Sequence, residues 1–126
     1  MKPAIALFGE AEKGNYDAAY LCHDLIDLCS YLGQKESNGL FLAIRSLMYD
    51  YSVIYFRVKE EGFSTENYFF GLHFLKTQSS LRNIIALGLP GVGDREIIDA
   101  SCSICHKYGS LLICSETDFY DLLTSK

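Results

Sequence analysis

Residues 84–116, IIALGLPGVGDREIIDASCSICHKYGSLLICSE, contain the order of elements that decides the fold. An apolar run at 84–89 leads into a proline–glycine turn at 90–93. A helical pattern over 95–108 and a second apolar run at 111–115 follow. Short apolar runs bounded by turn residues are typical of buried strands. The stretch therefore predicts a strand, a helix and a second strand, which is the unit that builds parallel sheets.

The same alternation extends over the rest of the chain. Further strands are predicted at 3–9 and 52–58, because both runs are rich in apolar, β-branched or aromatic residues. Apolar residues at three- and four-residue steps predict helices over 14–33 and 39–51. Ser64 or Thr65 can cap a further helix over 66–77, which is apolar around much of its circumference, and the capping pair Ser115 and Asp118 predicts a short last helix over 117–123. Strands separated by helices, with almost no hairpin signals, predict a single three-layer, Rossmann-like α/β domain over residues 1–126. Its sheet is expected to be mostly parallel, with about four strands.

The segment 14–33 gives the strongest helical signal. Its apolar residues form one stripe, Asn15 is suited to cap its start and Gly33 to end it. Acidic residues lie away from that stripe. One uninterrupted helix is therefore expected between the first strand and the polar bridge at 34–38.

Composition limits the class of protein. A chain of 126 residues with 49% hydrophobic residues fits one globular domain, and its net charge of −5 would repel a nucleic-acid backbone. The first apolar run is too short for a secretory signal, and no run approaches the roughly 20 residues that span a bilayer. The five cysteines lie within helical and strand patterns, which favours reduced thiols. We therefore expect a cytoplasmic protein that binds neither nucleic acid nor membrane.

The segment 102–106, Cys-Ser-Ile-Cys-His, has the spacing of a haem attachment or of half a zinc site. Both thiols continue an apolar helix face that starts at Ile98, and a buried free cysteine behaves as a small hydrophobe. Core packing is therefore the favoured interpretation, and a metal site together with Cys22 and His23 is the alternative. No metal or cofactor is expected.

The loops that follow the predicted strands gather glycines and carboxylates. In an open parallel sheet, ligands bind outside the carboxyl ends of the strands, where helix N-termini also point. Glycine at these positions lets the backbone approach a ligand or adopt a positive φ. The residues that this rule selects as binding candidates are Gly9, Gly14, Pro90, Gly91 and Gly93.

These glycines do not complete a nucleotide-binding motif. Gly9 and Gly14 have the outer spacing of a P-loop, but Asn15 and Tyr16 follow where lysine and a hydroxyl residue are required. The G-x-G-x-x-G fingerprint is also absent from the sequence. An NTP hydrolase is therefore not expected. A tight turn without a ligand explains the glycines at 91–93 as well as a phosphate cradle does.

Acidic residues at the same edge are the candidate catalytic groups. Glu10 and Glu12 lie in a loop that should cover the sheet edge, where a carboxylate can stabilise an oxocarbenium-like centre or position water. The same acids would suit magnesium equally well. Glu96 is a third candidate. Like Asp94 and Asp118, however, Glu96 is explained more simply as a cap or a partner of the helix dipole.

Three segments of the chain resemble the lysine-decarboxylase-like (SLOG) Rossmannoid proteins. They are IALFGEAEKGNYDAAYLCHDLIDLCSYLG at 5–33, NGLFLAIRSLMYDYSVIYFRV at 38–58 and ALGLPGVGDREI at 86–97, the last resembling the family's P-G-G-x-G-T-x-x-E turn. The turn is one residue shorter here, and Asp94 stands where threonine is expected. The resemblance implies a nucleotide or nucleotide-derived ligand, since well-known family enzymes release a base from a nucleoside monophosphate. It also implies phosphate-loop roles for Gly9, Pro90, Gly91 and Gly93, and matches Glu96 to the catalytic glutamate.

Two functions are therefore considered. The first is a small domain that binds a nucleotide-like ligand at the carboxyl edge of the sheet and hydrolyses its N-glycosidic bond, with Glu10, Glu12 and Glu96 as acids. The second is a non-enzymatic interaction module, or a degenerate homologue that keeps only the scaffold. The aromatic residues of the helix at 66–77 motivate this second function, because an apolar helix beyond the needs of the core often marks a partner surface. A homodimer is the expected assembly in that case.

Overall fold

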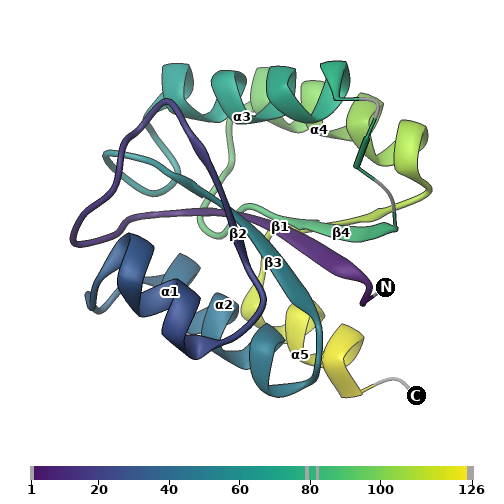
Figure 1. Ribbon diagram of the computed structural model, residues 1–126. Helices are drawn as coiled ribbons and strands as arrows, with labels where there is room; N and C mark the ends of the chain where they lie inside the picture. The colour runs from purple at the N-terminus through teal and green to yellow at the C-terminus, as the bar shows by residue number, and fades with distance from the viewer. Residues whose placement is uncertain (1, 79, 82, 125–126) are drawn as a thin grey trace.

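The structure, a computed structural model, describes residues 2–78, 80–81 and 83–124 and has three layers (Figure 1). Helices α3 and α4 cover one face of the central sheet, and α1, α2 and α5 cover the other (Figure 1). The elements in chain order are β1 (Ala4–Gly9), β2 (Ala19–Cys22), α1 (Leu25–Leu32), α2 (Asn38–Met48), β3 (Ser52–Arg57), α3 (Thr65–Thr77), β4 (Ile84–Gly88), α4 (Arg95–Tyr108), β5 (Leu111–Ile113) and α5 (Glu116–Thr124).

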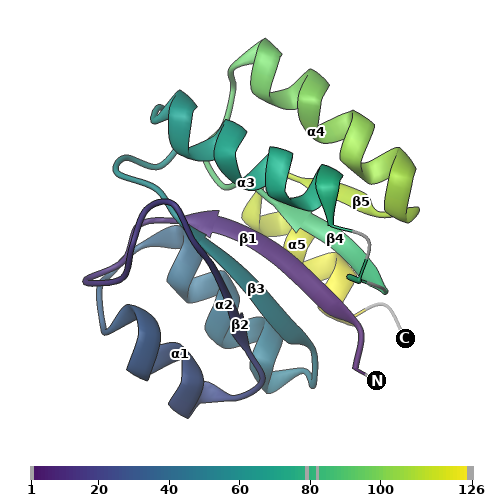
Figure 2. The same cartoon turned by 45° about the horizontal axis from the view of Figure 1, so that its top comes forward.

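The sheet has the strand order β2-β3-β1-β4-β5. β1 pairs in parallel with β3 and with β4, β4 pairs in parallel with β5, and only β2 is antiparallel to its neighbour. The view in Figure 2 shows β1, β3 and β4 side by side beneath α3. The predicted α/β class with a mostly parallel sheet is therefore confirmed.

The core consists of two apolar clusters, one on each face of the sheet. Successive side chains of a strand point to opposite faces, so Ile5 and Leu7 of β1 pack toward the α1, α2 and α5 layer. Phe8 packs toward α3 and α4, where its ring stacks on Phe56 and on Tyr68 at centroid distances of 4.7 and 5.5 Å. β1 is buried along its whole length, as expected for the central strand of a covered sheet.

The predicted helix over 14–33 is wrong in its first half. Residues 19–22 form β2, which pairs with the edge of β3, and the helix begins only at Leu25. Pairing with β2 gives the N–H and C=O groups on this edge of β3 hydrogen-bond partners, which a helix over the same residues would not supply. Asp24 is the N-cap of the shorter helix, because its side chain accepts a hydrogen bond from the Asp27 N–H at 2.8 Å. The predicted sheet of about four strands therefore has five. The predicted helix end at Gly33 is confirmed, since Gly33 is the C-cap of α1.

The cysteines of α4 do not both lie in the core. The buried face of this helix carries Ile97, Ser101 and Ile104, whereas Cys102 is exposed and Cys105 is partly buried. The prediction of core packing is therefore wrong for Cys102 and right in part for Cys105, whose pKa is raised to about 11 chiefly by burial. Within the described residues, no group of three or more His, Cys, Asp or Glu side chains is arranged to hold a metal ion.

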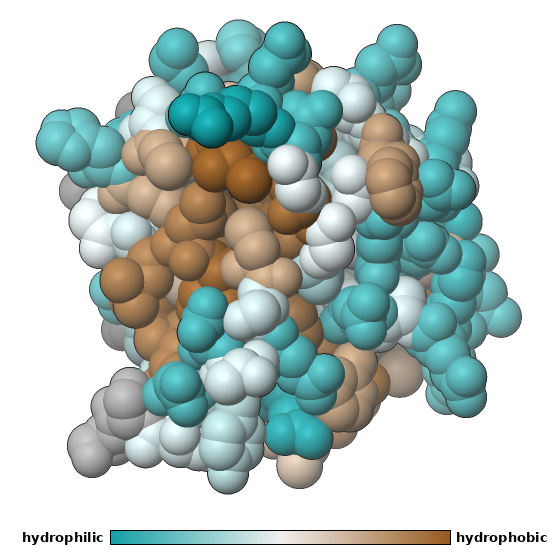
Figure 3. Space-filling model, turned by 180° about the vertical axis from the view of Figure 1, so that it is seen from behind, coloured by the Kyte–Doolittle hydropathy of each residue, from teal (hydrophilic) through white to brown (hydrophobic). Residues whose placement is uncertain are grey.

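The aromatic residues of α3 serve mainly the core. Tyr68 is fully buried, and Phe69 and Phe74 pack against the cluster beneath this helix. Most of the large exposed apolar residues lie on or beside α1 and α2. Seen from behind, hydrophobic residues also gather on part of the face between the two helical layers (Figure 3). None of the helices in the described ranges is long and apolar enough to cross a membrane.

The strand order creates a switch point beside β1. The chain passes from β1 to β3 through α1 and α2 on one face, and from β3 to β4 through α3 on the other face. β1 therefore lies between two connections that diverge, and the crevice outside the carboxyl ends of β1 and β4 is the place where open α/β sheets bind ligands.

Candidate functional site

The start of α2 lies directly against the end of β1. A Cβ atom added to Gly9 would be 2.5 Å from the Cα atom of Gly39, so both positions require glycine for this approach. The buried Tyr55 hydroxyl lies beside the contact and donates to the Glu10 carbonyl at 2.8 Å. This packing holds the N-terminus of α2 beside the first residue of the loop that follows β1.

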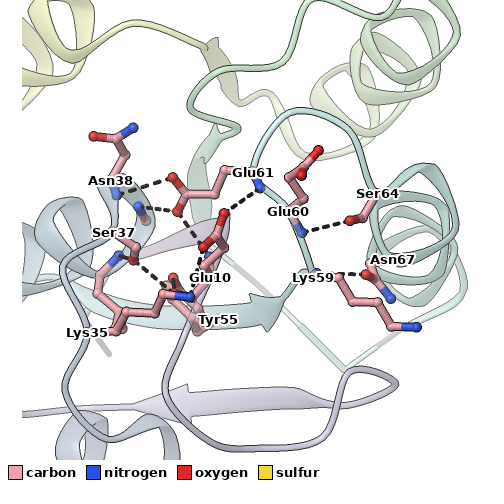
Figure 4. Close-up of polar contacts among 12 residues, drawn as sticks. Glu10, Lys35, Ser37, Asn38, Tyr55, Lys59, Glu60, Glu61, Ser64 and Asn67 are labelled. Carbon is pink, nitrogen blue, oxygen red and sulfur yellow. Dashed lines mark hydrogen bonds and ion pairs between the residues drawn. The ribbon is translucent and has the colours of Figure 1, made fainter.

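Two carboxylates link the loops that follow β1 and β3. The Glu10 N–H donates to Glu61 Oε2 at 3.0 Å, and the Glu61 N–H donates to Glu10 Oε2, also at 3.0 Å (Figure 4). Lys35 forms an ion pair with the other oxygen of Glu10, with Nζ and Oε1 2.9 Å apart. These two reciprocal hydrogen bonds and the ion pair with Lys35 fix both carboxylates at the rim of the sheet.

Glu61 also occupies the anion position at the start of α2. Its carboxylate accepts from the Asn38 N–H at 3.2 Å and from the Gly39 N–H at 2.9 Å. Ser37 completes the cap, because its hydroxyl oxygen accepts from the Leu40 N–H. The first N–H groups of a helix have no partner within the helix and favour negative charge. Here the chain supplies that charge from its own Glu61.

The surroundings of Glu10 keep it ionised. Its pKa is lowered from the ordinary value of 4.5, first by the hydrogen bond from the Glu61 N–H and then by the hydrogen bond and charge of Lys35, against a smaller effect of burial. Burial and the Glu61 charge raise the pKa of Tyr55, so its hydroxyl stays protonated and remains a donor to the loop.

Stability is therefore expected to depend on the charge of Glu10. Because its pKa is lower in the folded state than in the unfolded state, the stabilisation is fully present above pH 4.5 and is lost as the pH falls through the folded-state pKa. Glu10→Gln removes it at every pH. Urea unfolding from pH 7 to pH 3 should show a difference between the two proteins that shrinks on acidification.

The control for this measurement is Glu60→Gln, which removes the same charge from an exposed side chain of the loop that follows β3, next to Glu61. The free energy of unfolding of this control should differ little from that of the unmodified protein at neutral pH. If the free energy of unfolding of Glu10→Gln differed from that of the unmodified protein by the same amount from pH 7 down to pH 3, the lowered pKa of Glu10 would be contradicted.

Two adjoining cavities open at this rim. The larger, about 620 Å³, is lined by Glu10, Lys35, Glu36, Ser37, Asn38, Phe41, Ile44 and Glu61. The smaller, about 160 Å³, is lined by Asn38, Phe41, Leu42, Pro90, Gly91, Cys114 and Glu116. Asn38 and Phe41 line both cavities. Together the cavities extend from the end of β1 to the ends of β4 and β5, which is the switch point of the sheet.

Three of the predicted site residues, Glu10, Pro90 and Gly91, line these cavities. The loops after β3 and β4 also touch, because a Cβ atom on Gly62 would be 2.5 Å from the Gly91 carbonyl oxygen. Gly9 lies at the same rim, but the space above it is filled by Gly39 and the Tyr55 hydroxyl. Gly9 therefore supports the packing of α2 and leaves no room for a ligand.

The other predicted residues line neither cavity. Glu12 accepts from the Gln34 N–H at 2.9 Å and fastens its loop to the end of α1. Gly14 has a φ of 106° and lies over the end of α1. Gly93 and Glu96 are exposed beside the N-cap of α4. The three candidate acids, Glu10, Glu12 and Glu96, therefore do not share one site.

Sequence reasoning did not identify the groups that surround Glu10. Glu61 lies at the expected strand end, but its bond to Gly39 joins residues 22 positions apart, which no local pattern reveals. The sequence could have predicted the start of α2, because Ser37 directly precedes an apolar helical run and serine is a preferred N-cap residue. Phe41 lies within that same apolar run, so the sequence did not indicate that it would be exposed.

Comparisons of the chain with protein-family models, with curated proteins and with solved structures found no match. The likeness to the lysine-decarboxylase-like proteins therefore stays a prediction from sequence motifs.

Proposed function

We propose that the protein binds a nucleotide-derived ligand in the two adjoining cavities at the switch point. The observation that carries the proposal is the meeting of three features at one place. The carboxyl ends of β1 and β4, the start of α2 and the ionised Glu10 all border the same crevice. Ligand sites of open α/β sheets lie at such a point, and they combine apolar walls with a few fixed polar groups.

The lining favours the ribose and base of such a ligand over its phosphates. Carboxylate oxygens accept hydrogen bonds from hydroxyl groups, and Glu10 presents such oxygens at a fixed position. Phe41, a residue that is 42% exposed, borders both cavities; the Arg45 guanidinium carbon lies 4.6 Å from the centre of its ring, and the rest of the ring is the proposed stacking surface for a base. Three carboxylates against one lysine in the larger cavity disfavour a polyphosphate, and Glu61 already fills the anion position of α2. A nucleoside or a nucleotide with one ribosyl group in the cavity fits best.

The ionised state of Glu10 limits the hydrolysis that this cavity supports. A carboxylate with a lowered pKa can stabilise an oxocarbenium-like centre at the ribosyl C1′ atom, but it cannot donate a proton to a leaving base. The matching substrates carry a base that is cationic while attached, as in a pyridinium riboside. Water then adds to C1′, the bonding electron pair leaves with the base, which becomes neutral, and the proton of water passes to solvent.

The proposal is tested by calorimetric titration with adenosine, AMP, NAD and ADP-ribose, and by following nicotinamide release from NAD. At least one of these ligands is expected to bind in the micromolar range. Glu10→Gln and Phe41→Ala should each weaken that binding about tenfold, the usual cost of one charged hydrogen bond or one stacking contact.

Glu60→Gln is the matched control, because Glu60 is exposed and does not line either cavity. It should leave the affinity unchanged. The proposal is wrong if none of the four ligands binds at millimolar concentration, or if Glu10→Gln and Glu60→Gln have the same effect.

A further inference from the structure

Arg57 ends β3 and reaches into the loop between β1 and β2. Its Nη1 donates to the Gly14 carbonyl at 2.6 Å, and its guanidinium carbon lies 4.4 Å from the centre of the Tyr16 ring. Its Nε is buried and has no acceptor among the described residues. A buried N–H group without an acceptor is costly, and in native proteins it commonly marks the place of an additional partner.

Lys59 brings a second cation to the same ring. Its Nζ lies 5.6 Å from the centre of the Tyr16 ring, and the side chain extends away from the Glu10–Glu61 pair (Figure 4). In the described part of the chain, neither Arg57 nor Lys59 has a carboxylate within ion-pair distance. The positive charges of Arg57 and Lys59 at this ring are therefore not balanced by a neighbouring carboxylate, although the net charge of the chain is −5.

Fixing the loop explains only part of this arrangement. The bond to Gly14 and the stacking on Tyr16 would hold the loop in place with Arg57 alone. They account neither for the second cation nor for the Nε group without an acceptor. An oxyanion bound by the Arg57 guanidinium and the Lys59 ammonium would account for both, because these two kinds of group together form a preferred phosphate site.

We propose that Arg57 and Lys59, oriented by Tyr16, form an anion site for phosphate or a phosphate monoester. The site is separate from the proposed nucleotide-binding cavities, whose lining includes none of these three residues. On binding, the guanidinium tilts from the Tyr16 ring so that Nε–H points to a phosphate oxygen. Lys59 supplies the second charge from the exposed side.

The experiment is an NMR titration of the ¹⁵N-labelled protein with inorganic phosphate at constant ionic strength and pH 7. The Arg57 Nε–H signal, assigned by its loss in Arg57→Lys, and the amide signals of Gly14 and Tyr16 should shift together and saturate. Inorganic phosphate has neither ribose nor base, so the result does not depend on nucleotide binding at the switch point.

Lys59→Gln is the informative variant, because this exposed side chain can change without disturbing the fold. It should weaken phosphate binding about tenfold, the loss expected for one charge-assisted contact. Lys76→Gln, which makes the same change at an exposed position near the end of α3, should leave it unchanged. Shifts that rise linearly without saturation, or equal effects of the two lysine variants, would overturn the proposal.

Discussion

Gly39→Ala is expected to lower the free energy of unfolding by about 3 kcal/mol, a severe overpacking effect for one methyl group. The new Cβ would be 2.6 Å from the Cα atom of Gly9 and would also clash with the Tyr55 hydroxyl oxygen. Neither neighbour can rotate away, since one is backbone and the other is fixed in the core. β1 and α2 must separate, and this cost exceeds the gain of about 1 kcal/mol from replacing glycine within a helix.

Urea unfolding at pH 7 measures this effect, and Gly93→Ala is the matched control. A Cβ atom on Gly93 would meet no heavy atom within 4 Å in the described structure, so this variant should be within about 0.5 kcal/mol of the unmodified protein. Equal stability of the two variants would show that β1 and α2 are not in close contact. Of these two positions, only Gly39 is required to be glycine by close packing.

The elements that sequence predicted well have their signals close together in the chain. For α4, the N-cap Asp94, the apolar period and the C-cap Gly109 all lie within or beside the helix. β2 was missed because residues 19–22 have a helical spacing of apolar side chains, and only the neighbouring edge of β3 makes them a strand. An edge strand of this kind depends on its partner more than on its own residues.

The difference between local signals and tertiary contacts also explains which residues of the candidate site the sequence predicted. The rule that ligands bind at strand ends selected Glu10, Pro90 and Gly91, which line the two adjoining cavities, because strand direction alone decides where they lie. Glu12 and Glu96, selected by the same rule, line neither cavity. The Glu12 side chain bonds to the end of α1, and Glu96 lies in the first turn of another helix. Side-chain partners of this kind depend on tertiary contacts that a single sequence does not show.

Glu61→Ala is expected to lower the free energy of unfolding by about 2–3 kcal/mol and to abolish the ligand binding that we propose for the larger cavity. The carboxylate accepts from three backbone N–H groups, those of Glu10, Asn38 and Gly39. Hydrogen bonds to a charged acceptor contribute more than neutral ones, and each donor left without a partner adds a cost. Without Glu61, the start of α2 and the loop after β1 lose their common acceptor, so the walls of the cavity are no longer held together.

A double-mutant cycle distinguishes this linked arrangement from two independent acids. Glu10 and Glu61 each accept the backbone N–H of the other, so removing either side chain already weakens the hold on both loops. Glu10→Gln and Glu61→Gln together should therefore cost less than the sum of the single variants, with a coupling of about 1 kcal/mol. Glu60→Gln combined with Glu10→Gln should be additive, because the Glu60 side chain points away from the pair (Figure 4). Additivity in both cycles would mean that the two carboxylates act separately and would contradict the linked arrangement.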